Sequence, residues 1–153
     1  MTNFNEIYFQ IADSGDIIRI EPLYLVYPNA DLDWDRNWIK ANVTVQGGVF
    51  RGQFVAEFMT TDFEIFKKEL KNLDKDFNAI AKFEPIEQQL VIKIKGDGLG
   101  HFEVDCAATP HSHLGQTLTF SMIFDQTIIK KLVQQLDEIT KSFPIDGDLN
   151  ISN

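Results

Sequence analysis

The stretch WIKANVTVQGGVFRGQFVAEF, residues 38–58, decides the fold class of this chain. Trp38 to Gln46 is rich in β-branched and apolar residues, and Gly47-Gly48 supplies a turn. From Phe50 to Phe58 an apolar face alternates with one that carries Arg51, Gln53, Val55 and Glu57. Alternation with a period of two predicts an antiparallel hairpin with one buried face.

The same alternation extends to both sides of this hairpin. Further strands are predicted at residues 7–11, 17–27, 79–84, 90–95, 102–106 and 117–124. Pro22 lies inside one of them and marks a bend, a bulge or an edge, because proline removes a backbone donor. The short, turn-rich connections favour antiparallel pairing over parallel crossovers.

Two segments have helical periodicity. The first starts at Thr61, where Thr61 and Glu64 resemble a capping box, and the second runs from about Thr127 to Lys141. The sequence therefore predicts an α+β protein with a mainly antiparallel, curled sheet and two amphipathic helices packed on it. Residues 1–145 are expected to form one domain and residues 146–153 a flexible C-terminal tail, while the strand order cannot be deduced.

Composition limits the function classes. The 153 residues carry a formal net charge of -9, which disfavours nucleic acid as a direct partner and attracts basic proteins. A single cysteine excludes an internal disulfide and favours a reducing compartment. We find no signal peptide and no apolar run of membrane-spanning length, so we expect a cytoplasmic protein without a membrane partner.

Motifs that carry chemistry are weak. His111-Ser112-His113, with Cys106 and Asp105 nearby, could hold a metal only if the segment is extended, and a polar surface loop is the commoner structure. Cys106 alternates with acidic residues, which favours a small buried residue over a nucleophile. The glycines of residues 96–100 fit a hairpin turn better than a phosphate loop. We therefore predict no catalytic residue, metal or cofactor, and a binding protein rather than an enzyme.

The most unusual segment is DLDWDRNW, residues 31–38. Asp31, Asp33 and Asp35 have the spacing of the first calcium ligands of an EF-hand, but the later glycine and glutamate are missing. The segment could instead be structural, with Trp38 buried and Arg36 paired with an acid. It could also be an exposed recognition loop with Trp34 as an aromatic anchor. The predicted partner-binding residues are Asp31, Asp33, Trp34, Asp35 and Arg36.

Several segments together resemble the WapI-type immunity proteins of bacteria. The similar segments are DWDRNWI at residue 33, TTDFEIF at 60, FEPIE at 83, GDGLGH at 96, FDQT at 124 and FP at 143. They span residues 31–145 in the family's order, with Ile128-Ile129 in place of the usual aromatic-Leu pair. The resemblance implies a cytoplasmic antitoxin-like protein that binds and blocks a toxin domain, and it implies no catalytic residue.

Three hypotheses follow. The first is an immunity protein that neutralises a basic toxin, such as a nuclease, by charge complementarity. The second is a small-molecule-binding protein or small enzyme with a pocket on the sheet; a deep cavity at His101 or His111 would favour it and a solid core would disfavour it. The third is a scaffold or oligomer without a ligand, and the sequence does not give the oligomeric state.

Overall fold

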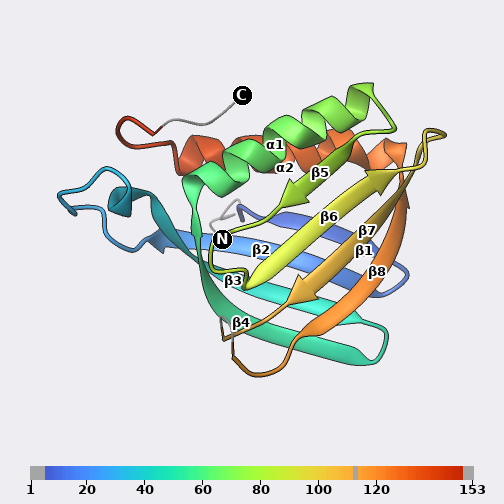
Figure 1. Cartoon of the computed structure of the whole chain (residues 1–153), viewed down its shortest axis with the longest axis horizontal. Coiled ribbons are helices and arrows are strands. Elements are labelled where there is room, and N and C mark those ends of the chain that lie inside the picture. Colours follow the sequence, from blue (N-terminus) through green and yellow to red (C-terminus); the bar gives the residue numbers. More distant parts are fainter. Residues whose placement is uncertain (1–5, 112–113, 150–153) are drawn as a thin grey trace, which may run out of the picture.

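Two four-stranded antiparallel sheets and two helices make up the computed structural model, which describes residues 6–111 and 114–149 (Figure 1). The first sheet contains, in this order, β1 (Phe9–Asp13), β2 (Asp16–Leu25), β3 (Trp38–Gly47) and β4 (Phe50–Met59). The second contains, also in chain order, β5 (Ile80–Phe83), β6 (Leu90–Gly96), β7 (His101–Ala108) and β8 (Leu118–Asp125). The helices are α1 (Thr60–Lys75), after the first sheet, and α2 (Ile129–Ser142), after the second.

The predicted α+β class, the antiparallel pairing and the two amphipathic helices are confirmed. The alternation of residues does not reveal that the strands form two separate sheets. They do so because α1 stands between β4 and β5, so each run of four consecutive strands, including β2 and β3 with the longer loop of residues 26–37 between them, pairs within itself. The chain therefore repeats four strands and a helix twice, without a repeat visible in its sequence.

The hairpin of residues 38–58 forms as predicted. Its register runs without a break from Trp38 opposite Met59 to Gly47 opposite Phe50. In the neighbouring strand the β2–β3 register shifts between Pro22 and Tyr24, so the proline stands at a bulge, one of its three predicted settings.

The start of α1 differs from the prediction. The helix begins at Thr60, and the Asp62 carboxylate accepts a hydrogen bond from the backbone N–H of Met59 at 2.8 Å. Glu64, predicted to close a capping box, instead forms an ion pair with Lys67 at 3.3 Å. The prediction was wrong because β4 continues to Met59, which moves the third helical position from residue 64 to residue 62.

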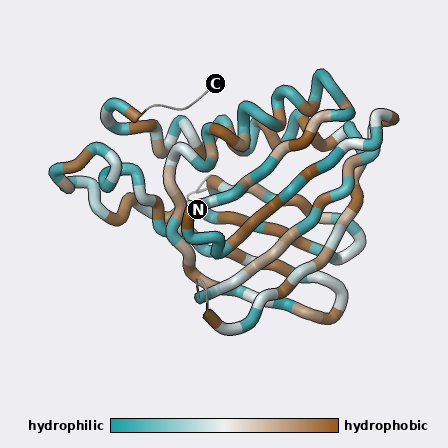
Figure 2. Tube along the Cα trace, viewed as in Figure 1, coloured by the Kyte–Doolittle hydropathy of each residue, from teal (hydrophilic) through white to brown (hydrophobic). Residues whose placement is uncertain are grey.

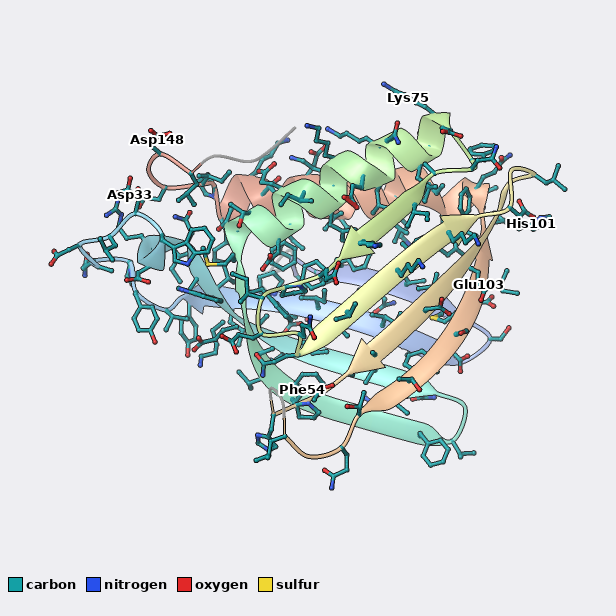
Figure 3. All side chains as sticks on the ribbon, viewed as in Figure 1. Asp33, Phe54, Lys75, His101, Glu103 and Asp148 are labelled. Atoms are coloured by element: carbon teal, nitrogen blue, oxygen red, sulfur yellow. The ribbon has the colours of Figure 1, made fainter. Side chains whose placement is uncertain are left out.

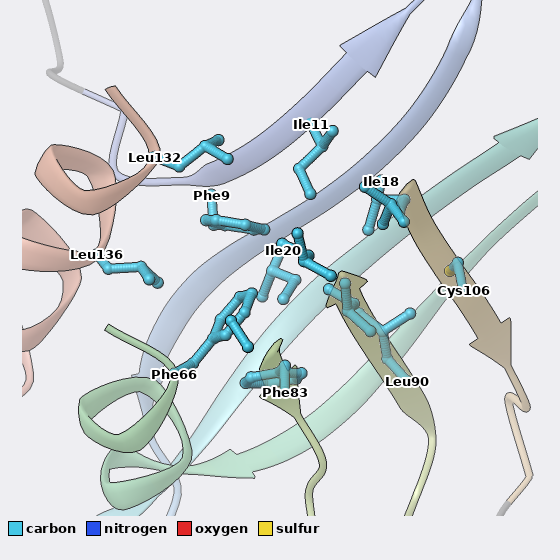
Figure 4. Close-up of a cluster of buried hydrophobic side chains, with 14 of the residues drawn as sticks. Phe9, Ile11, Ile18, Ile20, Phe66, Phe83, Leu90, Cys106, Leu132 and Leu136 are labelled. Atoms are coloured by element: carbon cyan, nitrogen blue, oxygen red, sulfur yellow. The ribbon is translucent and has the colours of Figure 1, made fainter. Parts of the chain in front are cut away.

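The core fills the space between the two sheets and under the helices (Figure 4). Phenylalanine rings connect all of these layers: Phe58 of β4 contacts Phe83 of β5 with centroids 5.1 Å apart, and Phe66 of α1 lies 5.6 Å from Phe83. Phe9 of β1 meets the same Phe66 ring at 5.2 Å. Because these rings touch one another, the two sheets and α1 share one apolar interior. Burial of each such side chain contributes about 2 kcal/mol to the stability of the fold.

The two helices lie side by side on top of the sheets, with polar residues along their outer faces (Figures 1 and 2). Lys67 of α1 joins them, since its ammonium group lies 3.4 Å from the Asp137 carboxylate and donates to the Thr140 hydroxyl. In α2, the Gln135 side chain accepts the backbone N–H of Gln10 in β1. Within the described residues, neither helix is long and apolar enough to cross a bilayer.

Candidate interaction surface at the β2–β3 loop

The loop between β2 and β3 projects from one end of the molecule, beside the segment that follows α2 (Figure 1). Its base is closed by a hydrogen bond from Val26 N–H to the Trp38 carbonyl at 2.9 Å. A short 3-10 helix, Asp35–Asn37, leads directly into β3. The loop has a fixed backbone at both of its ends, although it lies on the surface.

Asn37 holds this loop to the C-terminal segment. Its buried amide group donates to the carbonyls of Asp33 and Asp146 at 2.7 and 2.8 Å, and its side-chain oxygen accepts the Asp146 N–H at 2.8 Å. Asn37 and Asp146 are 109 residues apart in the chain. Since a buried amide without partners is costly, these three bonds fix both segments relative to each other.

Arg36 adds a charged connection between the same segments. Its guanidinium group pairs with the carboxylates of Asp33 and Asp146, and it donates to the backbone carbonyls of Ala30 and Asp31. The Asp33 and Asp146 carboxylates raise the pKa of Arg36, which stays charged. The guanidinium therefore acts as the centre around which the loop is folded.

Asp33 accepts bonds from both segments. The backbone N–H of Asp148 donates to its carboxylate at 3.0 Å, and Figure 3 shows the two residues next to each other. This N–H and the Arg36 guanidinium lower the pKa of Asp33. Gly147 lies against the same carboxylate with φ +93°, and a Cβ atom there would stand 2.4 Å from Asp33 Cγ, so only glycine fits.

We call this end of the molecule the acidic pole, formed by five aspartates and one arginine, namely Asp31, Asp33, Asp35, Asp146, Asp148 and Arg36. Arg36 neutralises part of the charge of Asp33 and Asp146. The carboxylates of Asp31 and Asp35, by contrast, make no hydrogen bond or ion pair with residues 6–111 or 114–149. They are the carboxylates that a basic partner could use without breaking a contact within the loop.

Exposed apolar side chains adjoin the pole. In the loop, Leu32 is 67% and Trp34 43% exposed. Tyr24 and Tyr27 are also exposed, and Tyr24 stands opposite Lys40 in the β2–β3 pairing. The Lys40 ammonium group pairs with Glu57 at 2.9 Å. Tryptophan and tyrosine are the residues most often found at the centre of protein interfaces, so this composition suits a protein partner.

The structure brings all five predicted site residues together but gives them two roles. Asp33 and Arg36 maintain the loop, whereas the side chains of Asp31 and Trp34 are exposed and that of Asp35 is half-buried. Sequence analysis missed Asn37 and the first residues of the predicted tail, because no local pattern indicates a contact over 109 residues. Asp146 and Asp148 are hydrogen-bonded to the loop, and a flexible tail stays a prediction for the segment as a whole.

The calcium-like spacing of the loop does not produce a metal site in the described residues, where no three metal-ligating side chains converge. The structure describes His111, which is exposed, whereas Ser112 and His113 lie outside the described residues.

Other features have structural explanations. Cys106 is 3% exposed, and burial raises the pKa of its thiol to about 12, which confirms a buried residue rather than a nucleophile. The glycines of residues 96–100 form the predicted hairpin loop, in which the Asp97 carboxylate accepts the backbone N–H groups of Leu99 and His101. These hydrogen bonds lower the pKa of Asp97, and the bond from the Leu99 N–H has the largest effect.

Two hollows open to solvent on the outer face of the second sheet. One, of about 240 Å³, is lined by residues that include Lys95, His101 and Glu103, and the other, of about 550 Å³, by residues that include Lys93 and Asp105. The charged residues that line both hollows alternate along β6 and β7 with buried residues. The hollows therefore lie on the surface and not in the apolar interior. Neither reaches the acidic pole.

Comparison with known proteins decides the family. The model of the immunity protein WapI-like family matches residues 9–144. This chain belongs to that family. The match confirms the resemblance seen in the motifs between residues 31 and 145, and it gives this WapI-like chain the role of an immunity protein, with a toxin as the partner that such a role implies. No curated protein matches the chain.

A solved structure shares the fold of this WapI-like protein. A guide-RNA-binding protein complex bound to a guide RNA matches with a TM-score of 0.51 at 10% sequence identity, covering 89% of this chain and 90% of the other. The MRP1/MRP2 structures of Trypanosoma bruciei match with a TM-score of 0.47 at 9% identity, covering 90% and 88%. At such identities the first likeness is one of fold alone.

Proposed function

We propose that this WapI-like immunity protein binds a basic bacterial toxin domain through the acidic pole and the adjoining aromatic side chains, and so blocks it. The observation that carries the proposal is the pair of carboxylates, Asp31 and Asp35, that have no partner among the described residues and flank the exposed Leu32 and Trp34 in sequence. Such a surface offers an apolar centre with a charged rim, as tight protein interfaces do.

The fixed conformation of the loop supports this function. Asn37 and Arg36 hold the loop in one shape before any partner arrives, so little conformational entropy is lost on binding. Because the Asp31 and Asp35 carboxylates make no bond to the described residues, a cationic partner can pair with them without competing for an existing contact.

A nuclease is the toxin class that we favour. Nucleases bind phosphate groups with lysine and arginine side chains, and a cluster of carboxylates can occupy such a site in place of the phosphates. The net charge of -9 would also speed the encounter with a basic domain at low ionic strength. The protein then acts by occlusion, without chemistry of its own, and we place it in the cytoplasm with the toxin it neutralises.

The test begins with capture. Tagged full-length protein is incubated with extract of its native bacterium, washed at low and at high salt, and the retained protein is identified, purified and assayed for toxin activity. We expect a basic partner that is lost at high salt and whose activity, as nuclease or otherwise, falls to zero at equimolar immunity protein. A partner with an acidic binding surface, or one that stays fully active when bound, would contradict the proposal.

A further inference from the structure

Each sheet has two edge strands, and three of the four edges are protected. In the five-residue β1 the Gln10 N–H is bonded to Gln135 of α2, and in the four-residue β5 the Lys82 N–H is bonded to Glu69 of α1 at 2.8 Å. β8 lies against β1 and β3, where Phe120 leaves no room for a side chain at Gly47. These are the usual ways in which proteins prevent edge-to-edge pairing.

β4 is the exception. It is ten residues long, has no bulge in its pairing with β3, and contains neither proline nor lysine. The Gln89 side chain accepts the outward N–H of Glu57 at 3.2 Å. Backbone groups alternate in direction along a strand, so those of Arg51, Gln53 and Val55 point the same way as that of Glu57. None of these three has a partner for its N–H or carbonyl in residues 6–111 or 114–149.

The side chains of this free half of β4 are also unusual. Phe50 and Val55 are 66% and 52% exposed, and Val49, in the turn that precedes the strand, is 92% exposed, which is high for residues of this size and polarity. An exposed apolar edge with unpaired backbone groups is a template for another strand.

Gly52, in the middle of this edge, is not explained by the chain itself. A Cβ atom there would meet only Val45 at 3.5 Å, an ordinary contact, and the backbone does not need a positive φ. Glycine inside a strand weakens it and often marks the close approach of another backbone. No backbone within the described residues comes that close to Gly52, and the open space leaves room there for the side chain of a variant.

We propose that two copies of this protein pair through the free halves of β4, antiparallel, with Gly52 on the two-fold axis. This register places Arg51 of each copy opposite Gln53 of the other copy. Each of these two pairs exchanges two backbone hydrogen bonds, which makes four in all. Phe50 then faces Phe54, which is partly buried, and Val49, in the turn before β4, comes near Val55, so apolar residues of the two copies cover one another. No two like charges stand opposite each other, and the contact is isologous, as a closed dimer requires.

The dimer is independent of the proposed toxin binding. The acidic pole adjoins Trp38 and Met59 at one end of the β3–β4 hairpin, whereas Val49 is at the tip of the other end, about 30 Å away for a strand of this length. The labelled residues Asp33 and Phe54 lie in different parts of Figure 3. A dimer of this kind leaves both acidic poles exposed.

Sedimentation of the full chain over a concentration range up to about 100 µM tests the proposal, together with a matched pair of variants. Gln53→Glu places a carboxylate opposite Arg51 of the second copy and should tighten the dimer severalfold, while Gln53→Arg places like charges opposite each other and should weaken it by tenfold or more. Circular dichroism checks that both variants fold. A wild-type chain that stays monomeric, or variants that shift the dimer equally, would overturn the proposal.

A cysteine on the axis gives a second test that does not depend on charge. Gly52→Cys has room for its side chain and should form a disulfide between two copies under mild oxidation, because directly opposed residues of antiparallel strands are within bonding reach. The native Cys106 is buried and does not interfere. The matched control is Ala12→Cys, exposed on the protected strand β1. Equal crosslinking of the two variants would contradict the β4 interface.

Discussion

The two ends of the β3–β4 hairpin differ in whether their backbone polar groups have hydrogen-bond partners. At the acidic pole the backbone is irregular, and its polar groups are satisfied by Asn37, Arg36 and Asp33 through bonds to a segment more than a hundred residues away. At the tip the backbone is a regular strand, yet the outward groups of Gln53 and Val55 have no partner in the described chain. The irregular backbone of the pole is therefore more completely hydrogen-bonded than the regular strand at the tip.

This difference separates two kinds of surface. The pole has a conformation that is already fixed and presents charge and aromatic rings, which suits specific recognition of an unlike partner. The β4 edge presents backbone groups and apolar side chains, which suits pairing with a strand of the same kind. The predictions below, in order of decreasing effect, test whether the pole is as firmly held as its contacts indicate.

The largest effect is expected from Asn37→Ala. It removes the three hydrogen bonds of a buried side chain and leaves backbone groups of Asp33 and Asp146 without these partners, at an expected cost of about 3 kcal/mol in the free energy of unfolding. Denaturant titration measures this cost. Asn42→Ala, on the outer face of β3, is the control and should cost less than about 0.5 kcal/mol. Equal losses would show that the pole is not anchored by Asn37.

A pH effect should come from Asp62, the carboxylate at the start of α1. Burial raises its pKa to about 6, above that of an unfolded chain, while the bond from Met59 opposes the rise. The folded state therefore binds this proton more tightly, and the associated stability, at most about 3 kcal/mol, is present below pH 4 and lost as the pH rises through 6. Asp62→Asn keeps an acceptor for Met59 and should remove this loss. Parallel stability curves for the two proteins between pH 4 and 7 would refute the assignment.

Gly147→Ala should release the C-terminal segment from the pole. The added methyl group would overlap Asp33 and the positive φ would be strained, so we expect a loss of about 2 kcal/mol of local stability and faster hydrogen exchange at the Asp146 and Asp148 amides. Gly15→Ala has nearly the same φ, +92°, with nothing within 4 Å of its Cβ, and shows the backbone cost alone. If exchange at residues 146 and 148 is the same in both variants, the contact with Asp33 contributes nothing.

The smallest effect is expected from Lys40→Met, which removes the ion pair with Glu57 near the pole. The pair is partly exposed, so the loss should be about 0.5 kcal/mol at low salt and vanish at high salt. Unfolding experiments at the two salt concentrations measure the difference, and a loss of several kcal/mol would mean that this pair is structural.

Local patterns predicted most of the fold. The alternation of residues 38–58, the helical stripes and the turn glycines gave the α+β class and nearly every element, because each depends on neighbours in sequence. They did not give two sheets in place of one, nor the capping residue of α1, because both depend on where β4 ends. The order of the strands could not be predicted either, because it depends on which strand edges pair in three dimensions.

The sequence shows which residue types the candidate loop contains, but it does not show how these residues are bonded to one another. An acidic, tryptophan-containing loop is visible in the sequence, and the five residues chosen from it do lie together. The distinction between the Asp33 carboxylate, which is bonded to Arg36 and Asp148, and the Asp31 carboxylate, which has no such contact in the described residues, requires the structure. The buried Asn37 could not be distinguished from an ordinary loop asparagine without knowing that Asp146 returns to it.

The central claim is that the unpartnered carboxylates of the pole bind the toxin, and one affinity comparison tests it most directly. Asp31→Asn with Asp35→Asn, and Asp13→Asn with Glu103→Gln, change the net charge equally. The second pair is exposed and lies away from the pole, since Asp13 is at the β1–β2 turn, at the opposite end of β2 from the loop, and Glu103 is on β7 of the second sheet. With the purified toxin partner, we expect the first double variant to bind at least tenfold more weakly, mainly through slower association, and the second to bind within about twofold of the wild type. Equal weakening by both would mean that only the net charge matters and that the pole is not the binding site.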